Sequence, residues 1–124
     1  MIEAQHLKIG NLVYVKSTDQ LGVVTCINKH VGLAVNDSFV YLSFEDCDGI
    51  PITEDILLKL GFEKDKEISY RYHLEDFISY DIDDNCVSIY DTWLVKRFPY
   101  LHQFMNLYFA ILGEELPTDK ILNT

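Results

Sequence analysis

The chain has 124 residues, of which 48% are hydrophobic and 24% are charged, and its formal net charge is −10. This composition excludes a disordered chain, and the length is sufficient for one domain that folds without a disulfide or a metal. The acidic excess disfavours direct binding to nucleic acids and to anionic membranes, because both are negatively charged.

The negative charge is unevenly distributed along the chain. Residues 1–44 contain three acidic and three basic side chains, whereas residues 45–124 contain seventeen acidic and seven basic ones. An acidic surface commonly serves only to keep a protein soluble. The other interpretation is contact with a partner protein that has a basic surface, or with a second copy of the chain.

The three cysteines, Cys26, Cys47 and Cys86, form no Cys-x-x-Cys motif, and the sequence predicts reduced thiols in a cytoplasmic protein. The first residues do not resemble a signal peptide, and no apolar segment is long enough to span a membrane. Carboxylates beside Cys47 are expected to raise the pKa of its thiol, which makes it a poor nucleophile. Cys26 and Cys86 lie in apolar runs and are expected in the core.

Residues 1–50 are predicted to be rich in β-strands. Short runs of β-branched and aromatic residues are separated by Gly, Asn, Asp and Ser at intervals of about ten residues. The predicted strands are residues 12–15, 21–28, 31–35 and 39–44. This spacing indicates an antiparallel meander or a small SH3-like barrel.

Residues 51–62 predict a short helix. Thr53 is a favourable N-cap, and Glu54 and Asp55 follow it in the first turn, where the helix dipole favours acidic residues. Gly61 fits the position just after the helix, and Phe62 can supply the apolar contact that often follows.

Residues 68–96 predict a second β-hairpin unit, preceded by a solvated linker at residues 63–67. The strands are expected at residues 68–74, 77–82 and 86–90, with residues 92–95 extending the last of them. Tyr70 and Tyr72, on the first of these strands with Arg71 and His73, could stack on a base. Cross-strand aromatic pairing in the sheet explains the same residues, and we favour it.

Residues 99–113 predict the longest helix, with Pro99 at its start, Gly113 at its end and Pro117 beyond. Its apolar arc is wide, which indicates extensive packing against a sheet. The remaining strip contains the uncharged polar residues His102, Gln103 and Asn106. Such a strip can bind a ligand or a partner, or it can form hydrogen bonds within the fold.

Charged residues flank this helix in the unfavourable sense for its dipole. Lys96 and Arg97 precede the positive end, and Glu114 and Glu115 follow the negative end. Screening by water and salt accounts for them. A functional interpretation is that they face opposite charges on a partner.

No motif for nucleophilic catalysis, phosphate binding or zinc binding occurs in the sequence. Asp81, Asp83 and Asn85 are spaced like the start of a calcium loop. However, Cys86 stands where such a loop requires Gly, and Thr92 stands where it requires a bidentate Glu. We therefore predict no metal, no cofactor and no enzymatic activity.

Tyr100–Leu116 reads Y-L-H-Q-F-M-N-L-Y-F-A-I-L-G-E-E-L. It resembles the C-terminal signature Y-x-H-Q-x-Q-N-L-Y-F-A-L-T-G-E-E-L of short uncharacterised proteins from phages and prophages of gut anaerobic bacteria. The segments I-P-I-T-E-D-I-L-L-K-L-G-F and L-K-I-G-N-L-V also resemble that family. Met105 and Leu112 depart from the signature, so a polar contact of the family is in doubt here. The resemblance implies a bacterial host cytoplasm and no particular activity.

Together these features predict a single α+β domain over residues 1–124, with the C-terminal helix packed on the sheet. The expected function is a non-enzymatic interaction protein of phage or mobile-element origin that binds and modulates a host protein, such as a defence component. The alternative is a small-ligand binder that sequesters a nucleotide-type signal. The candidate binding residues are His102, Gln103, Asn106, Tyr72, Glu114 and Glu115.

Overall fold

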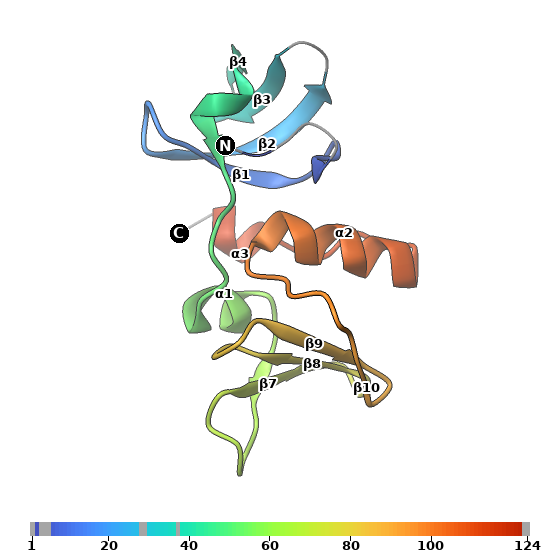
Figure 1. Cartoon of the computed structure of the whole chain (residues 1–124). Coiled ribbons are helices and arrows are strands. Elements are labelled where there is room, and N and C mark those ends of the chain that lie inside the picture. The colour runs from blue at the N-terminus through green and yellow to red at the C-terminus, as the bar shows by residue number, and fades with distance from the viewer. Residues whose placement is uncertain (1, 3–5, 28–29, 37, 123–124) are drawn as a thin grey trace. The chain divides into compact units, whose positions relative to one another are not determined.

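A computed structural model describes residues 2, 6–27, 30–36 and 38–122. It contains two antiparallel β-sheets and several helices, which confirms the predicted α+β class (Figure 1). Contacts divide the chain into a first unit, Met1–Ile50 with Tyr100–Glu115, and a second unit, Pro51–Pro99 with Leu116–Thr124. The predicted strand end at Asn28 and turn residue Asp37 lie outside the described residues.

The sheet of the first unit has the strand order β4-β3-β2-β1-β5. The strands are β1 (Leu12–Val15), β2 (Gln20–Ile27), β3 (Val31–Val35), β4 (Ser38–Leu42) and β5 (Cys47–Asp48), and the 3-10 turn η2 (Phe44–Asp46) precedes β5. The first four strands form a meander, and β5 returns to pair with β1. The antiparallel meander agrees with the prediction of a meander or a small SH3-like barrel.

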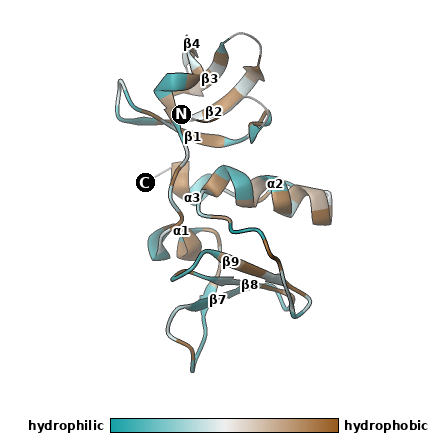
Figure 2. Cartoon of the chain, viewed as in Figure 1, coloured by the Kyte–Doolittle hydropathy of each residue, from teal (hydrophilic) through white to brown (hydrophobic). Residues whose placement is uncertain are grey.

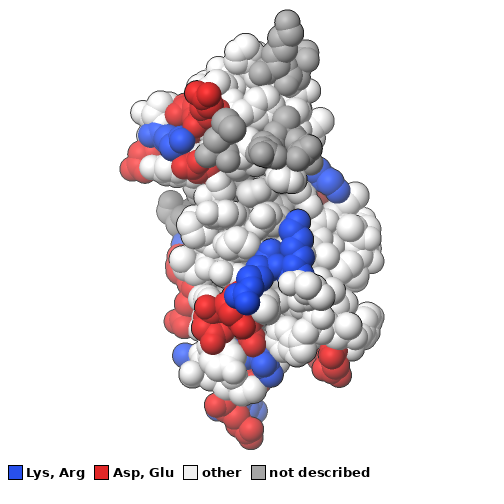
Figure 3. All heavy atoms as spheres, viewed as in Figure 1, with Lys and Arg blue, Asp and Glu red and all other residues white. Residues whose placement is uncertain are grey.

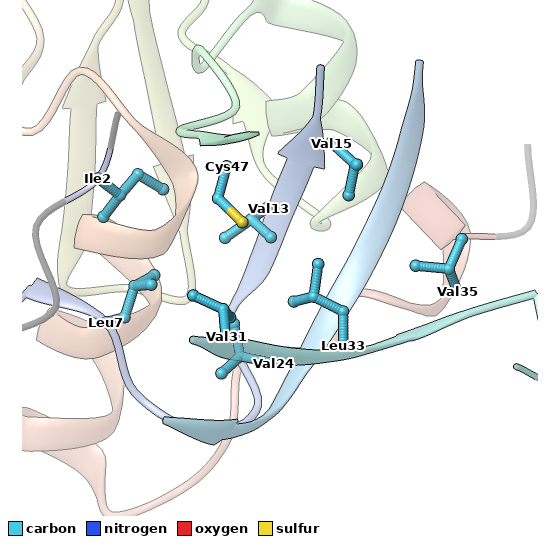
Figure 4. Packing of buried hydrophobic residues seen from close by; sticks show 9 residues of the cluster. All are labelled: Ile2, Leu7, Val13, Val15, Val24, Val31, Leu33, Val35 and Cys47. Carbon is cyan, nitrogen blue, oxygen red and sulfur yellow. The ribbon is translucent and has the colours of Figure 1, made fainter. Parts of the chain in front are cut away.

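One face of this sheet forms the hydrophobic core of the first unit. Figure 4 shows the side chains of β1, β2 and β3 converging with those of Ile2, Leu7 and Cys47. Because side chains alternate between the faces of a strand, Val31, Leu33 and Val35 all point into this core. The residues between them, Gly32 and Ala34, belong to the other face.

The long helix α2 (Leu101–Leu112) also belongs to the first unit. Its buried residues are Leu101, His102, Phe104, Met105 and Tyr108. Gly113 ends the helix in the left-handed region at φ 71°, as the sequence predicts, and its N–H donates to the carbonyl of Phe109. Figure 2 shows that α2 carries both hydrophobic and hydrophilic residues.

The second unit contains a sheet of strand order β10-β9-β8-β7-β6. Its elements are α1 (Glu54–Lys59), β6 (Glu63–Lys64), β7 (Arg71–Leu74), β8 (Ile78–Asp81), β9 (Cys86–Ile89), β10 (Thr92–Trp93) and α3 (Asp119–Leu122). The inner face carries Tyr72, Leu74, Ile78, Tyr80 and Val87, all buried. Thr53 caps α1 by accepting a hydrogen bond from the Ile56 N–H, as predicted.

Three features of the second unit differ from the sequence prediction. The linker at residues 63–67 contains β6, which pairs with β7. Residues 92–95 do not extend β9, because Tyr90 and Asp91 both adopt positive φ and reverse the chain. Consequently, β10 folds back on β9 and pairs Trp93 with Ser88. The short helix α3 has no counterpart in the prediction.

None of the described helices has the length and apolar character needed to cross a membrane. Acidic and basic residues form several separate groups on the face shown in Figure 3.

Candidate functional site

Asn106 is hydrogen-bonded within the first unit. Its Oδ1 accepts from Asn11 Nδ2 at 2.8 Å, and its Nδ2 donates to the carbonyl of His6 at 3.2 Å. The Asn11 side chain in turn accepts from the N–H of Lys8 at 2.7 Å. This chain of bonds connects α2 to the segment before β1, and it supports the structural alternative for Asn106.

His102 and Gln103 lie at the start of α2. His102 is buried, and its ring is stacked on that of Tyr100. Gln103 Oε1 accepts from the Tyr100 N–H at 3.1 Å, while the Gln103 N–H donates to the Tyr100 carbonyl. This reciprocal pair caps the helix. The strip predicted from helical spacing is thus largely occupied by internal contacts.

Tyr72 lies in the core of the second unit, and its hydroxyl donates to the carboxylate of Glu54 on α1. That hydrogen bond, with burial, raises the pKa of Tyr72 to about 12. The ring is therefore a packing element that connects β7 to α1, and its burial removes it from the surface on which a base could stack.

The charged residues that flank α2 are exposed. Glu114 and Glu115 follow Gly113 at the surface. Arg97 donates to the carbonyl of Asp84, and the Lys96 ammonium lies over the ring of Phe98. Of the six candidate binding residues, Glu114 and Glu115 are exposed, Gln103 and Asn106 are half-buried, and His102 and Tyr72 are buried.

The cysteines lie in different environments, and all three thiols are free. Burial raises the pKa of the Cys47 thiol, and Asp46 and Asp48 raise it further, which agrees with the sequence interpretation. Cys26 and Cys86 are half-buried and lie on the faces opposite the two cores. Their predicted place in the core is wrong. Cys86 occupies the position that alternates with the buried Val87, and the β-bulge between Val24 and Cys26 shifts Cys26 to the face of Gly32.

The outer face of the first sheet carries an exposed aromatic pair, Phe39 and Tyr41 on β4. They are 75% and 72% exposed and face the small residues Ala34 and Gly32 on β3. The Tyr41 ring crosses Gly32, because a Cβ there would be 3.2 Å from Tyr41 Cε1. We call Phe39 and Tyr41 the β4 aromatic pair.

The β4 strand is also an edge of its sheet. Ser38–Leu42 contains no charged residue and no proline, the residues that usually protect an edge from pairing with another chain. An aromatic, uncharged edge strand can recruit an extended segment of another protein.

The outer face of the second sheet is polar. Arg71 on β7 binds Asp81 on β8 through two hydrogen bonds, Nε to Oδ1 at 2.8 Å and Nη2 to Oδ2 at 3.0 Å. Its guanidinium lies 4.8 Å from the centre of the Trp93 ring and 6.0 Å from that of Tyr70. Asp81 accordingly raises the pKa of Arg71. The guanidinium thus contacts a carboxylate and lies near two aromatic rings.

Beside this ion pair, Asp65, His73 and Ser79 form a hydrogen-bonded row. His73 Nε2 lies 2.6 Å from Asp65 Oδ1, and His73 Nδ1 lies 2.9 Å from Ser79 Oγ. His73 and Ser79 are direct cross-strand partners on β7 and β8. The His73 bond is the main cause of the lowered pKa of Asp65, and the N–H groups of Ile68 and Glu67 add to it.

Ligand atoms of Asp81, Asp83 and Asp84 lie within 4.8 Å of one another. Asp81 already forms its two bonds with Arg71, so its oxygens are committed to a cation of the protein itself. The hairpin also departs from a calcium loop at Cys86, as noted above. These residues therefore carry no metal assignment.

No family model, curated protein or solved structure matches this chain.

The Asp65–His73–Ser79 row is absent from the sequence interpretation. The predicted strands leave a two-residue turn at Glu75 and Asp76, which would place His73 opposite Ile78. In the structure the turn has three residues, because β8 begins after Phe77, and His73 therefore falls opposite Ser79. The participation of Asp65 has no sequence signal either, because it depends on how the loop before β7 folds.

Proposed function

We propose that this chain is a protein-binding module of phage or mobile-element origin, and that its action on the partner is by contact and needs no catalysis. The β4 aromatic pair and the free edge of β4 are the proposed contact surface. The family resemblance suggests a host protein as the partner, such as a defence component, whose action the bound chain modulates in the cytoplasm.

The exposure of Phe39 and Tyr41 is the observation that carries this proposal. Large aromatic side chains are enriched where proteins bind one another, since they bury much area at little entropic cost. Here two of them are adjacent on the same face of an edge strand. An extended segment of the partner could pair with β4 while its side chains pack on the two rings.

Charge suggests what flanks that segment in the partner. The first unit has eight acidic and three basic residues, and acidic Glu45, Asp46 and Asp48 follow β4 in the chain. A partner segment with an apolar centre and basic flanks would complement this distribution. A second copy of the chain is the other candidate occupant, and it lacks that complementarity.

The proposal can be tested with the double variant Phe39→Ser/Tyr41→Ser. Proteins captured from a bacterial lysate would be identified, and the purified partner would be titrated against each variant. We expect the double variant to weaken binding at least about tenfold, the effect of losing roughly 1.4 kcal/mol. Tyr90→Ser is the matched control, because Tyr90 is also 72% exposed but lies in the second unit.

Charge reversal at Glu114 and Glu115 tests the basic character of the partner. The variant Glu114→Lys/Glu115→Lys should slow association and reduce its dependence on salt, because exposed charges act mainly on the encounter rate. Equal binding by the wild type and the Phe39→Ser/Tyr41→Ser variant would refute the β4 surface. A dimer of the wild type that dissociates in that variant would identify a second copy as the occupant.

A second candidate function is binding of a small aromatic ligand, such as a nucleotide-type signal, on the outer face of the second sheet. It is favoured by Tyr70 and Trp93, which are partly exposed and both contact Arg71. A thermal-shift screen with nucleotides tests it. A melting temperature that no nucleotide raises would remove this candidate.

A further inference from the structure

We propose that Ser79 is a nucleophilic hydroxyl, with His73 as its general base and Asp65 as the positioning residue, that takes acyl groups from small activated carboxylic esters. This activity belongs to the second unit and goes beyond the binding role proposed for β4. The sequence offers no motif for it, because the row forms only when a loop and a hairpin come together.

The carboxylate of Asp65 is held in place before it meets the imidazole. Its Oδ2 accepts from the N–H groups of Glu67 at 2.9 Å and Ile68 at 2.7 Å. The N–H of Asp65 itself donates to the Arg71 carbonyl at 2.8 Å. Its second oxygen, Oδ1, is thereby directed at His73 Nε2.

This geometry selects the tautomer of neutral His73. A carboxylate only accepts hydrogen bonds, so the single ring proton must lie on Nε2, facing Asp65. Nδ1 is then an acceptor, and the Ser79 hydroxyl donates its proton to it over 2.9 Å. A serine that donates to an imidazole held by a carboxylate has the arrangement of an activated nucleophile.

The three side chains are partly exposed to solvent. The His73 side chain is 39% exposed and that of Asp65 is 22% exposed, while Ser79 is half-buried. Arg71 is the only Lys or Arg side chain on β7, β8 and β9, and it lies on the same face, diagonal to Ser79. Its Nε and Nη2 bind Asp81, and its positive charge is the feature of these strands that would favour a developing oxyanion.

The reaction begins when Ser79 Oγ forms a bond to the carbonyl carbon of the ester. The hydroxyl proton passes to His73 Nδ1, and the carbonyl π electrons move to oxygen. Collapse of this intermediate breaks the bond to the leaving alkoxide, which takes the proton from His73. Water then attacks the acyl-serine, with His73 again accepting and returning the proton, and the carboxylic acid is released.

The same hydrogen bonds also fasten the loop before β7 to the sheet, so a purely structural role must be separated by experiment. p-Nitrophenyl acetate is a suitable probe, because its leaving group is activated and its release is visible. We expect the wild type to release nitrophenolate at least about a hundredfold faster than Ser79→Ala, the lower end of what general-base catalysis contributes. Ser69→Ala, at an exposed serine, is the matched control and should retain the wild-type rate.

Mass spectrometry of the acetylated wild type locates the acyl group without any variant. We expect it on Ser79 and not on Ser69. His73→Gln should reduce the rate of nitrophenolate release as much as Ser79→Ala does. Asp65→Asn should lower kcat with little change in KM, an effect that a loop fastening alone would not produce, provided that circular dichroism shows a folded chain.

Two results would overturn the proposal. One is a Ser79→Ala variant that is as fast as the wild type. The other is acetyl distributed over lysines and His73 with none on Ser79. Partner binding by Ser79→Ala is expected to be normal, so the two proposals fail independently.

Discussion

The two units have sheets of the same size but use their outer faces differently. Both sheets have five antiparallel strands, and both bury one apolar face. The outer face of the first sheet exposes the β4 aromatic pair, whereas that of the second carries hydrogen-bonded polar pairs, Arg71 with Asp81 and His73 with Ser79. The alternation that builds a sheet thus leaves its outer positions free to carry either a contact surface or a polar site.

The amount of charge does not explain this difference. The first unit has eight acidic and three basic residues, and the second has twelve and seven, so each carries five net negative charges. What differs is placement. The second unit brings cations onto its sheet face to pair with carboxylates, while β4 in the first unit has no charge at all.

The largest expected effect is on an inner face. Leu33 is fully buried, so Leu33→Ala should reduce the stability of the first unit by about 2–5 kcal/mol. Urea unfolding would be followed by far-UV circular dichroism and by the fluorescence of Trp93, the single tryptophan, which lies in the second unit. We expect the circular dichroism midpoint to fall and the fluorescence midpoint to stay. One shared transition would instead support a single domain over residues 1–124.

On the polar outer face, Arg71→Met should lower the free energy of unfolding by about 2 kcal/mol, because it leaves the nearly buried Asp81 carboxylate without its partner. Lys96→Met is the matched control, since Lys96 is exposed, and it should stay within about 0.5 kcal/mol. Urea midpoints that are equal for the two variants would contradict the role given to this pair.

On the apolar outer face, Gly32→Ala should lower the free energy of unfolding by about 1–3 kcal/mol, because the added methyl group overpacks this face. The added Cβ would lie 2.8 Å from Cys26 Sγ and 3.2 Å from Tyr41 Cε1. In a Cys26→Ala background the cost should fall, because the closer obstacle is gone. If Gly32→Ala lowers the stability equally in the wild-type and Cys26→Ala backgrounds, this double-mutant cycle would argue against the packing of Cys26 on Gly32.

In contrast, Phe39→Ser and Tyr41→Ser should each change stability by less than about 0.5 kcal/mol, because both side chains are largely exposed. Combined in one chain, the same substitutions are expected to weaken partner binding at least about tenfold. A large loss of stability, measured by thermal unfolding, would show that the pair serves the fold and not a partner.

The pH dependence of stability should include Asp65. Its pKa in the folded chain lies well below the ordinary value, mainly because of the bond from His73. As the pH falls, the Asp65 carboxylate is therefore protonated at a higher pH in the unfolded chain than in the folded one. Asp65 stabilises the fold above about pH 4, and this contribution is lost as the pH falls further. Asp65→Asn should flatten the acid limb of a plot of stability against pH, while Asp76→Asn, at an exposed residue, should not.

Much of the local structure is predictable from short-range chemistry. Thr53 caps α1, Gly113 ends α2, and the runs of β-branched residues become strands. The errors occur where an outcome depends on distant residues. Helical spacing alone places His102 in the polar strip, but burial is decided by what packs against the helix, and here His102 is buried.

The sequence by itself determined the α+β class and most of the elements, because these depend on residue spacing and turn chemistry within a few positions. Only the tertiary structure decided which outer-face residues meet. Strand β10 folds back on β9 through two residues with positive φ, and Asp65 reaches His73 only because its loop is held by backbone hydrogen bonds. Contacts of this kind depend on register and loop path, which local propensity does not encode.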